Sequence, residues 1–507
     1  MPDPSPSLVV SLAVLAAAAI PAQGSGYSPT ILGPSKEGEL ALSKFTVDPD
    51  LAVSLWAAEP MLANPVAFWV DAHGRAFVAE TFRLHKGVTD NRRYGEDWIE
   101  AELACRSVED RIAQYRRFFP EKIDEWTREH ERIRLLTDDD GDGRADRATV
   151  FADGFHRLEH GIAAGVLEHE GHVYFTCIPE LWRLRDRDGD GVADEREVLH
   201  TGYGVHTALL GHDMHGLIVG PDGRLYFSIG DRGLRVTTRE GGTIDLPDEG
   251  AVLRCEPDGS GLEVFHRGLR NPQELAFDDF GNLFTGDNNS DGGDRARFVY
   301  LMEGGDCGWR IGFQTLADRG PWNREKLWHP PFRGQAAYLA PPVANYASGP
   351  SGLCFDPGTG LPERWRGHFL LCDFRGSSSH SGVFALRVVP HGAGFELVGE
   401  QPVIRGVLPT DVMVGPDGAV WLTDWTEGWE QTGKGRIYRI TAKDGADPRA
   451  AEVARLLREG MRGRPVPDLV RLLAHADRRV RQAAQFALAA AGEAEALHGV
   501  AADRGAS

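Results

Sequence analysis

The sequence predicts an all-β fold, a six-bladed β-propeller, with a helical insertion in its first blade region and a short C-terminal α-helical segment. Two observations predict the propeller. A pattern of two apolar strands joined by a turn recurs six times between residues 45 and 440, and further short strands follow most copies. Repeated groups of short strands are typical of propeller blades. The 61 glycines agree with a fold that needs many tight turns.

Each copy of the repeat has an apolar strand, a turn with Asp or Gly, and a second strand that ends in a small or acidic residue. The six copies span residues 66–80, 161–177, 216–231, 274–287, 352–373 and 411–424. Two of the turns are Pro-Asp-Gly, in which proline presets φ and glycine accepts a positive φ. We expect an early strand at 52–56 to close the ring against the strand at 436–440.

Two segments are predicted to be helical. Residues 83–135 form an insertion in which Ser107 caps a helix and Pro120 ends it. Its role is a lid or flank on the propeller, or simple packing. After a linker at 441–465, residues 466–507 resemble one HEAT-type helical unit. A single unit cannot bury its own apolar face, so we expect it to be incomplete or to dock on another surface.

Composition limits the function classes. The net charge of −20 argues against nucleic acid, which requires a basic face. Residues 1–23 are predicted to be a signal peptide, because the apolar run 8–19 is too short to cross a bilayer. No Lys or Arg precedes that run. We therefore expect an exported protein, periplasmic or at the cell surface, without a transmembrane segment.

The six cysteines permit disulfides in an exported chain, or they are buried free thiols. No Cys-x-x-Cys-His sequence occurs, so no covalently bound haem is predicted in this chain.

Polar residues stand just before several copies of the repeat. Because the innermost strand of each blade begins at one mouth of the central channel, these residues are expected to converge there. They include His160, His215, Arg270 and Asn271. Such a group indicates either a functional pocket or a structural ring of hydrogen bonds. His206 and His212 are expected to be hydrogen-bonding loop residues.

Three stretches resemble one known family. Residues 215–226, followed by Ile229-Gly230-Asp231, resemble the propellers of pyrroloquinoline-quinone (PQQ) sugar dehydrogenases and sorbosone dehydrogenases. Arg270-Asn271-Pro272-Gln273 and residues 349–353 resemble two further motifs of that family. The insertion, acidic loops and HEAT-like end are similar to PVC-type haem-binding CxxCH proteins, in which a cytochrome c follows.

The resemblance implies roles for the matching residues. His215 matches the general base that takes the proton of a sugar hydroxyl, and Asp231 matches the carboxylate that orients it. Arg270 and Asn271 match contacts to the quinone oxygens, and Gln273 belongs to the same motif.

The resemblance has one departure. The family places two arginines before the sixth copy to hold the carboxylates of the cofactor, where this chain has residues 407–410, Val-Leu-Pro-Thr. Arg375 is the candidate to replace a cation in the fifth blade. The implied activity is oxidation of a sugar or alcohol with PQQ, followed by electron transfer to a cytochrome. The alternative is a non-catalytic propeller and HEAT scaffold that binds a glycan or a protein.

Two acidic loops have the spacing of calcium ligands. Residues 186–197 satisfy every side-chain position of a twelve-residue calcium loop, and residues 138–149 match its first nine positions. The candidate ligands are Asp186, Asp188, Asp190, Asp194 and Glu197 in one loop, and Asp138, Asp140, Asp142 and Asp146 in the other. Strand-like flanks distinguish both from EF-hands. The alternative is a solvated acidic turn.

Overall fold

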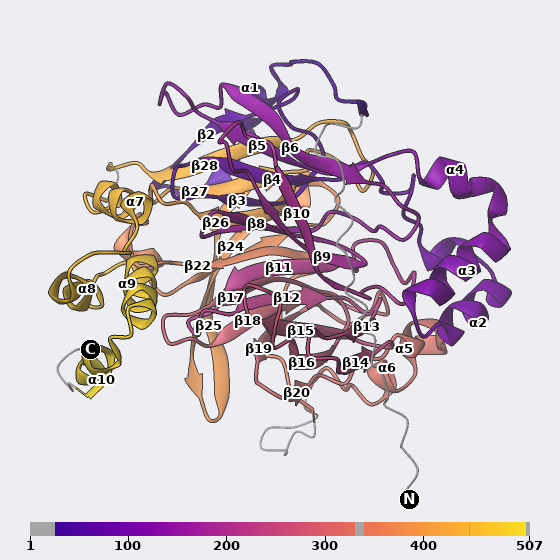
Figure 1. Cartoon of the computed structure of the whole chain (residues 1–507). Coiled ribbons are helices and arrows are strands. Elements are labelled where there is room, and N and C mark those ends of the chain that lie inside the picture. Colours follow the sequence, from indigo (N-terminus) through magenta and orange to yellow (C-terminus); the bar gives the residue numbers. More distant parts are fainter. Residues whose placement is uncertain (1–25, 330–338, 446, 503–507) are drawn as a thin grey trace, which may run out of the picture.

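The computed structural model describes residues 26–329, 339–445 and 447–502. Its core is a ring of six antiparallel blades, so the predicted fold class is confirmed (Figure 1). The predicted signal peptide at 1–23 lies outside the described residues. Among the described residues, no helix combines the length and hydropathy needed to cross a bilayer.

Each blade contains at least four strands, which are given below in their order from the channel outward. Blade one is β3 (Pro65–Val70), β4 (Ala76–Glu80), β5 (Glu131–Thr137) and β6 (Arg147–Phe155); blade two is β7 (Gly165–His169), β8 (His172–Cys177), β9 (Glu180–Arg185) and β10 (Glu195–Thr201). Blade three is β11 (Met214–Val219), β12 (Leu225–Ile229), β15 (Gly250–Cys255), β16 (Glu263–Leu269) and β20 (Gly305–Asp306).

The second half of the ring follows the same order. Blade four is β17 (Pro272–Phe277), β18 (Leu283–Asp287), β19 (Arg297–Leu301) and β21 (Ala344–Asn345). Blade five is β22 (Pro350–Phe355), β23 (Phe369–Asp373), β24 (Gly382–His391), β25 (Gly394–Arg405) and β1 (Thr46–Val47); blade six is β26 (Pro409–Val414), β27 (Val420–Asp424), β28 (Arg436–Ala442) and β2 (Leu51–Ala57). A separate hairpin, β13 (Leu234–Thr237) and β14 (Thr243–Leu246), extends from blade three.

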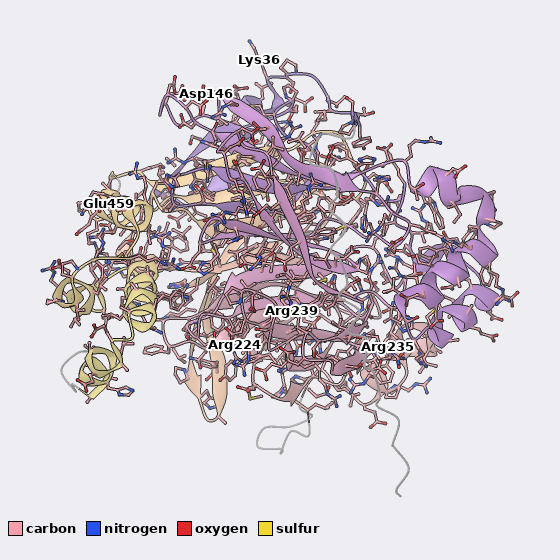
Figure 2. The ribbon with its side chains drawn as sticks, in the orientation of Figure 1. Lys36, Asp146, Arg224, Arg235, Arg239 and Glu459 are labelled. Carbon is pink, nitrogen blue, oxygen red and sulfur yellow. The ribbon has the colours of Figure 1, made fainter. Side chains whose placement is uncertain are left out.

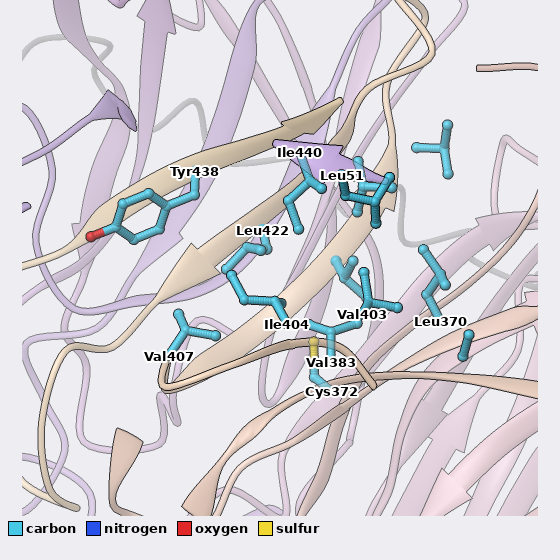
Figure 3. Packing of buried hydrophobic residues seen from close by; sticks show 14 of the residues in the cluster. Leu51, Leu370, Cys372, Val383, Val403, Ile404, Val407, Leu422, Tyr438 and Ile440 are labelled. Atoms are coloured by element: carbon cyan, nitrogen blue, oxygen red, sulfur yellow. The ribbon is translucent and has the colours of Figure 1, made fainter. Parts of the chain in front are cut away.

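An N-terminal strand closes the ring. The innermost strands contact one another in chain order, and β26 of blade six contacts β3 of blade one. β2 is the outermost strand of blade six, where Val53 pairs with Ile440. The predicted closure is therefore confirmed. Apolar side chains fill the space between blades, as Leu370 and Ile404 of blade five do against Leu422 and Tyr438 of blade six (Figure 3).

The helical insertion packs on one side of the ring. It contains α2 (Glu96–Ala104), α3 (Val108–Phe118) and α4 (Ile123–Trp126), and Ser107 caps α3 as predicted. The fully buried guanidinium of Arg83 anchors the insertion, because it donates hydrogen bonds to six backbone carbonyl groups. These belong to Gly87, Trp126, Glu129, His156, Arg157 and His160.

The C-terminal helices lie on the opposite side (Figure 1). They are α7 (Ala450–Glu459), α8 (Val466–Leu472), α9 (Arg478–Ala490) and α10 (Ala494–Ala502). Helix α7 occupies part of the segment that we expected to be a linker, because Val453 and Leu456 pack with Leu469 and Val480 in a common core. The shorter helices of the chain are α1 (Glu37–Leu42), α5 (Gly312–Thr315) and α6 (Pro321–Arg324). All six cysteines are free thiols, and five are buried.

Candidate functional site

Helix α9 closes one end of the central channel, which we call the back. Its side chains donate hydrogen bonds to backbone carbonyls where the innermost strands of blades three, four and six end. The pairs are Gln482 with Val219 and Gly220, Gln485 with Pro221, Arg478 with Phe277 and Asp278, and Arg479 with Val414 and Gly415. The C-terminal helices therefore dock on the propeller itself.

Between α9 and the innermost strands lies a chamber of about 440 Å³, lined by strands of all six blades. Six acidic residues line it, and two of them, Glu274 of β17 and Asp411 of β26, act on each other electrostatically. Burial raises the pKa of Asp411 to about 7. Burial also raises the pKa of Glu274 well above its ordinary value, and the negative charge of Asp411 adds to that effect. The chamber therefore contains two carboxyl groups that resist ionisation.

At the other end of the channel, which we call the mouth, an acidic residue ends the second strand of four blades. In each case its carboxylate accepts hydrogen bonds from backbone N–H groups next to the start of the innermost strand. The pairs are Glu80 with Ala63, Asp287 with Arg270 and Asn271, Asp373 with Ser348 and Gly349, and Asp424 with Leu408. In these blades the acid of the repeat is structural.

Blade three departs from this pattern. The Asp231 carboxylate follows β12, and its two oxygens bind side chains instead of the backbone. Oδ1 accepts a hydrogen bond from His212 Nδ1 at 2.7 Å, and Oδ2 accepts one from Trp309 Nε1 at 2.8 Å. All three residues are buried. This departure marks the His212–Asp231 pair as the candidate catalytic dyad.

The dyad is arranged as a general base requires. Burial, the largest single influence, acts to raise the pKa of Asp231, but His212, Arg270 and Trp309 together hold that pKa below its ordinary value. Asp231 is therefore an ionised acceptor. When Nδ1 donates to Asp231, a neutral His212 ring keeps the lone pair on Nε2, which can accept a proton.

The dyad histidine differs from the one predicted from the sequence. The prediction paired Asp231 with His215, which instead lies inside β11 and donates from Nε2 to the Gly211 carbonyl at 3.0 Å. Burial lowers the pKa of His215, so this imidazole is held neutral. We therefore move the candidate base from His215 to His212, which stands in the loop before the strand.

Arg270, Asn271 and Gln273 lie beside the dyad, as predicted, but they are engaged with other protein groups. The Arg270 guanidinium donates to Gln314 Oε1 at 3.1 Å and to Asp291 at 3.0 Å, and it lies over the Trp309 ring. Asn271 accepts a hydrogen bond from Gln273 Nε2 at 2.9 Å. The indole of Trp309 thus contacts both the acid of the dyad and this arginine.

Arg375 lies at blade five, apart from this group. Its guanidinium pairs with Asp373 and is 40 % exposed. The helical insertion instead approaches the dyad closely, because Glu102 accepts a hydrogen bond from Ala208 N at 2.8 Å and Asp90 accepts one from Leu210 N at 3.3 Å. The insertion therefore supports the loop that leads to His212, as a flank of the mouth.

The chain belongs to the DUF7133 family. The family model, described as a domain of unknown function, matches residues 37–444. That range contains the six blades and ends before the C-terminal helices. A comparison with curated proteins gives no match.

Solved structures share the fold of this DUF7133 propeller. A structure named glucose dehydrogenase is 16% identical, covers 77% of this chain and 99% of its own, and has a TM-score of 0.50. The PQQ-bound aldose sugar dehydrogenase from Streptomyces coelicolor is 17% identical over 78% of this chain and 100% of its own, with a TM-score of 0.47. The apo-form of the soluble aldose sugar dehydrogenase from Escherichia coli is 13% identical over 78% and 100%, with a TM-score of 0.48. At these identities the likeness concerns the fold alone.

The acidic loops occupy equivalent turns of neighbouring blades, β5–β6 and β9–β10. Three carboxylates in each loop have oxygens within 4.8 Å of one another: Asp138, Asp140 and Asp146 in the first, and Asp186, Asp188 and Asp190 in the second. Asp146 lies at the outer edge of the molecule (Figure 2). Asp142 and Asp194 are outside these groups, although they accept backbone N–H hydrogen bonds within the loops as the clustered carboxylates do. Glu197 instead pairs with Arg183 and Arg239.

Both loops contact the preceding blade in the same way. Ala145 N donates to the Trp56 carbonyl in β2 at 2.8 Å, and Ala193 N donates to the Phe151 carbonyl in β6 at 2.8 Å. Each loop thus joins its own blade to the outermost strand of the blade before it. The first loop does this at the junction where the ring closes.

Proposed function

We propose that this protein is an exported dehydrogenase-like propeller that oxidises a sugar or another alcohol at the mouth of its channel. The observation that carries the proposal is the buried hydrogen bond between His212 and Asp231. Among the described blades, only blade three has an acid of the repeat that binds a histidine. Loss of the hydroxyl proton to His212 Nε2 would accompany transfer of hydride from the carbinol carbon to an acceptor.

The sequence motifs and the names of the structural neighbours favour PQQ as the hydride acceptor. The described residues fit PQQ only in part. By its resemblance to the family motif, Asn271 would donate to a quinone oxygen. The carboxylates of PQQ require cationic side chains, but the two candidate arginines already have partners. Arg270 is paired with Asp291, and Arg375 is paired with Asp373. We therefore assign proton transfer to the dyad and derive no step through PQQ. A cytochrome c is the proposed next electron carrier.

The first experiment is a turnover assay on the purified protein. It is supplied with PQQ and calcium, and separately with other quinones and with a flavin, and a redox dye reports oxidation of aldoses and simple alcohols. We expect dye reduction with at least one acceptor and one substrate. The absence of turnover across the whole panel would favour the alternative, a glycan-binding or protein-binding scaffold, which the paired arginines also favour.

We further propose that both acidic loops bind Ca²⁺, which would stabilise the junctions between blades. Calcium at tenfold and hundredfold excess over Kd stabilises the folded state by about 1.4 and 2.7 kcal/mol, and extracellular sites have Kd values on the order of 10⁻⁴ to 10⁻³ M. Millimolar calcium should therefore raise the Tm of metal-free protein by a few degrees. Replacing Asp188 and Asp190 together by alanine should remove much of the rise.

The matched control for calcium is Glu197→Gln, because Glu197 lies in the same loop but pairs with arginines. This variant should keep the full response. Magnesium should act weakly, since it prefers a tighter octahedral shell and keeps its waters. A melting temperature that neither calcium nor chelator moves would show that these loops are solvated turns.

A further inference from the structure

One tryptophan at the mouth is exposed. The chain has twelve tryptophans, all within the described residues, and Trp429 is the most exposed of them, at 64 %. It lies in the loop between β27 and β28 of blade six, which also contacts residues next to blade one. Gln431 Nε2 donates to the Leu84 carbonyl at 3.2 Å, and Gly433 N donates to Asn64 Oδ1 at 3.0 Å. These contacts fix the loop that carries the indole.

The indole also packs on residues of blade five. Phe374 packs edge-on against it, with ring centroids 5.1 Å apart. Gly376 lies beneath it with a φ of +68°, and a Cβ at that position would stand 2.1 Å from Trp429 Nε1. Only glycine lets the ring lie on the backbone there. The ring is therefore supported on one side and open to solvent on the other, although burial would have stabilised it.

The surroundings of the open face are polar. Arg375, Ser379 and His380 on the same blade-five loop are exposed, and Ser377 Oγ lies 2.9 Å from Ser379 Oγ. Among the described residues, no other large apolar side chain on these two loops is exposed; the exposed Leu32 of the N-terminal segment donates its N–H to the Gly433 carbonyl on the far end of the β27–β28 loop. A specific protein interface buries about 800 Å² on each partner, so a single indole among hydroxyl, imidazole and guanidinium groups does not match that kind of partner. It matches one sugar ring, which offers an apolar face and a rim of hydroxyls.

We propose that Trp429 is the stacking platform of a carbohydrate subsite at the rim of the mouth, so that the substrate class is saccharides rather than simple alcohols. The inference rests on the proposed function for its link to oxidation, but the subsite itself binds sugar without turnover. The supported face of Trp429 orders a pyranose ring, and the serines, His380 and Arg375 are positioned to bind its hydroxyls.

The test uses calorimetry to measure the binding of glucose, of glucose oligosaccharides and of galactose oligosaccharides. Iodide quenching of tryptophan fluorescence is a second readout. The saccharide that binds should protect the exposed tryptophan from iodide. Trp429→Ala should weaken that binding at least tenfold, whereas Trp429→Phe should retain it within a few-fold. Gly376→Ala should also weaken it, because the new Cβ displaces the indole without removing it.

Phe280→Ala is the matched control. Phe280 is 89 % exposed in the turn between β17 and β18, at the back of the propeller, and its loss should leave binding unchanged. Binding is measured without any electron acceptor, which separates failure of this subsite from failure of the proposed oxidation. Equal affinity in the wild type and in Trp429→Ala, or no saccharide binding at all, would overturn the inference.

Discussion

Replacing His212 by alanine is expected to lower kcat/KM for the oxidised substrate by about two to four orders of magnitude, the usual contribution of a general base. Its Nε2 is the proton acceptor in the proposed reaction, and no other described histidine is hydrogen-bonded to Asp231. Asp231→Asn should have an effect of similar size, because an amide no longer stabilises the imidazolium that forms. Both variants should retain the wild-type Tm within a few degrees.

His215→Gln distinguishes the two candidate histidines. The glutamine amide can replace the hydrogen bond from His215 Nε2 to the Gly211 carbonyl, so the fold around β11 should be preserved. If His212 is the base, this variant should keep its activity within a few-fold. Loss of activity in His215→Gln, together with retained activity in His212→Gln, would return the catalytic role to His215. Steady-state kinetics with the substrate found in the first assay measures both.

Trp309→Phe tests the second hydrogen bond to Asp231 and does not bear on the choice between His212 and His215. It removes the N–H that binds Asp231 Oδ2 but keeps an aromatic ring beneath Arg270. The remaining stabilisation of the Asp231 carboxylate then comes from His212 and Arg270.

The fold could be predicted from the sequence because its signals are local. Each copy of the repeat consists of two strands around a turn. The strand predicted at 52–56 then pairs with the free edge of the last blade and closes the ring. The docking of α9 could not be predicted in the same way. Gln482 donates to the Gly220 carbonyl, about 260 residues earlier in the chain. The helical pattern of the sequence gives no information about so distant a partner.

The candidate dyad lies in the blade that the sequence pointed to, but the histidine that is hydrogen-bonded to Asp231 is His212 and not His215. His212 and His215 are three residues apart, and the choice between them depends on where β11 begins and on the direction of each ring. The position of His212 before the strand was a usable signal, because the other mouth residues also precede their strands. Trp309 had no such signal, since it is 78 residues from Asp231 in the chain.

The chamber at the back predicts an unusual dependence of stability on pH. The pKa values of Glu274 and Asp411 are raised in the folded protein, so in the unfolded chain both groups ionise at lower pH. Between about pH 4 and pH 7 the unfolded state therefore loses protons that the folded state still holds. The free energy of unfolding should fall as the pH rises through this window, and the full penalty should be present above it.

Glu274→Gln is the variant that exposes this penalty. Glutamine keeps an acceptor for the Gly216 N–H, which Glu274 binds at 3.4 Å, and it removes one of the two charges. Because glutamine carries no charge to bury, the variant should be more stable than the wild type at pH 8 and should melt at a higher temperature. The difference should shrink as the pH falls towards 5, because the folded protein takes up protons at the raised pKa values of the pair.

The nearby positive charges do not remove this effect. Arg478 and Arg479 of α9 line the same chamber, but their guanidinium groups bind strand-end carbonyls and, for Arg479, the Asp477 carboxylate. Asp279→Asn, at the outer rim of the back, is the control and should change little at either pH, since Asp279 pairs with Arg481 at a partly exposed position. Melting curves at pH 5, 6.5 and 8 measure the difference. If Glu274→Gln is no more stable than the wild type at pH 8, an ion or an ordered water network neutralises the pair, and the chamber does not carry the penalty.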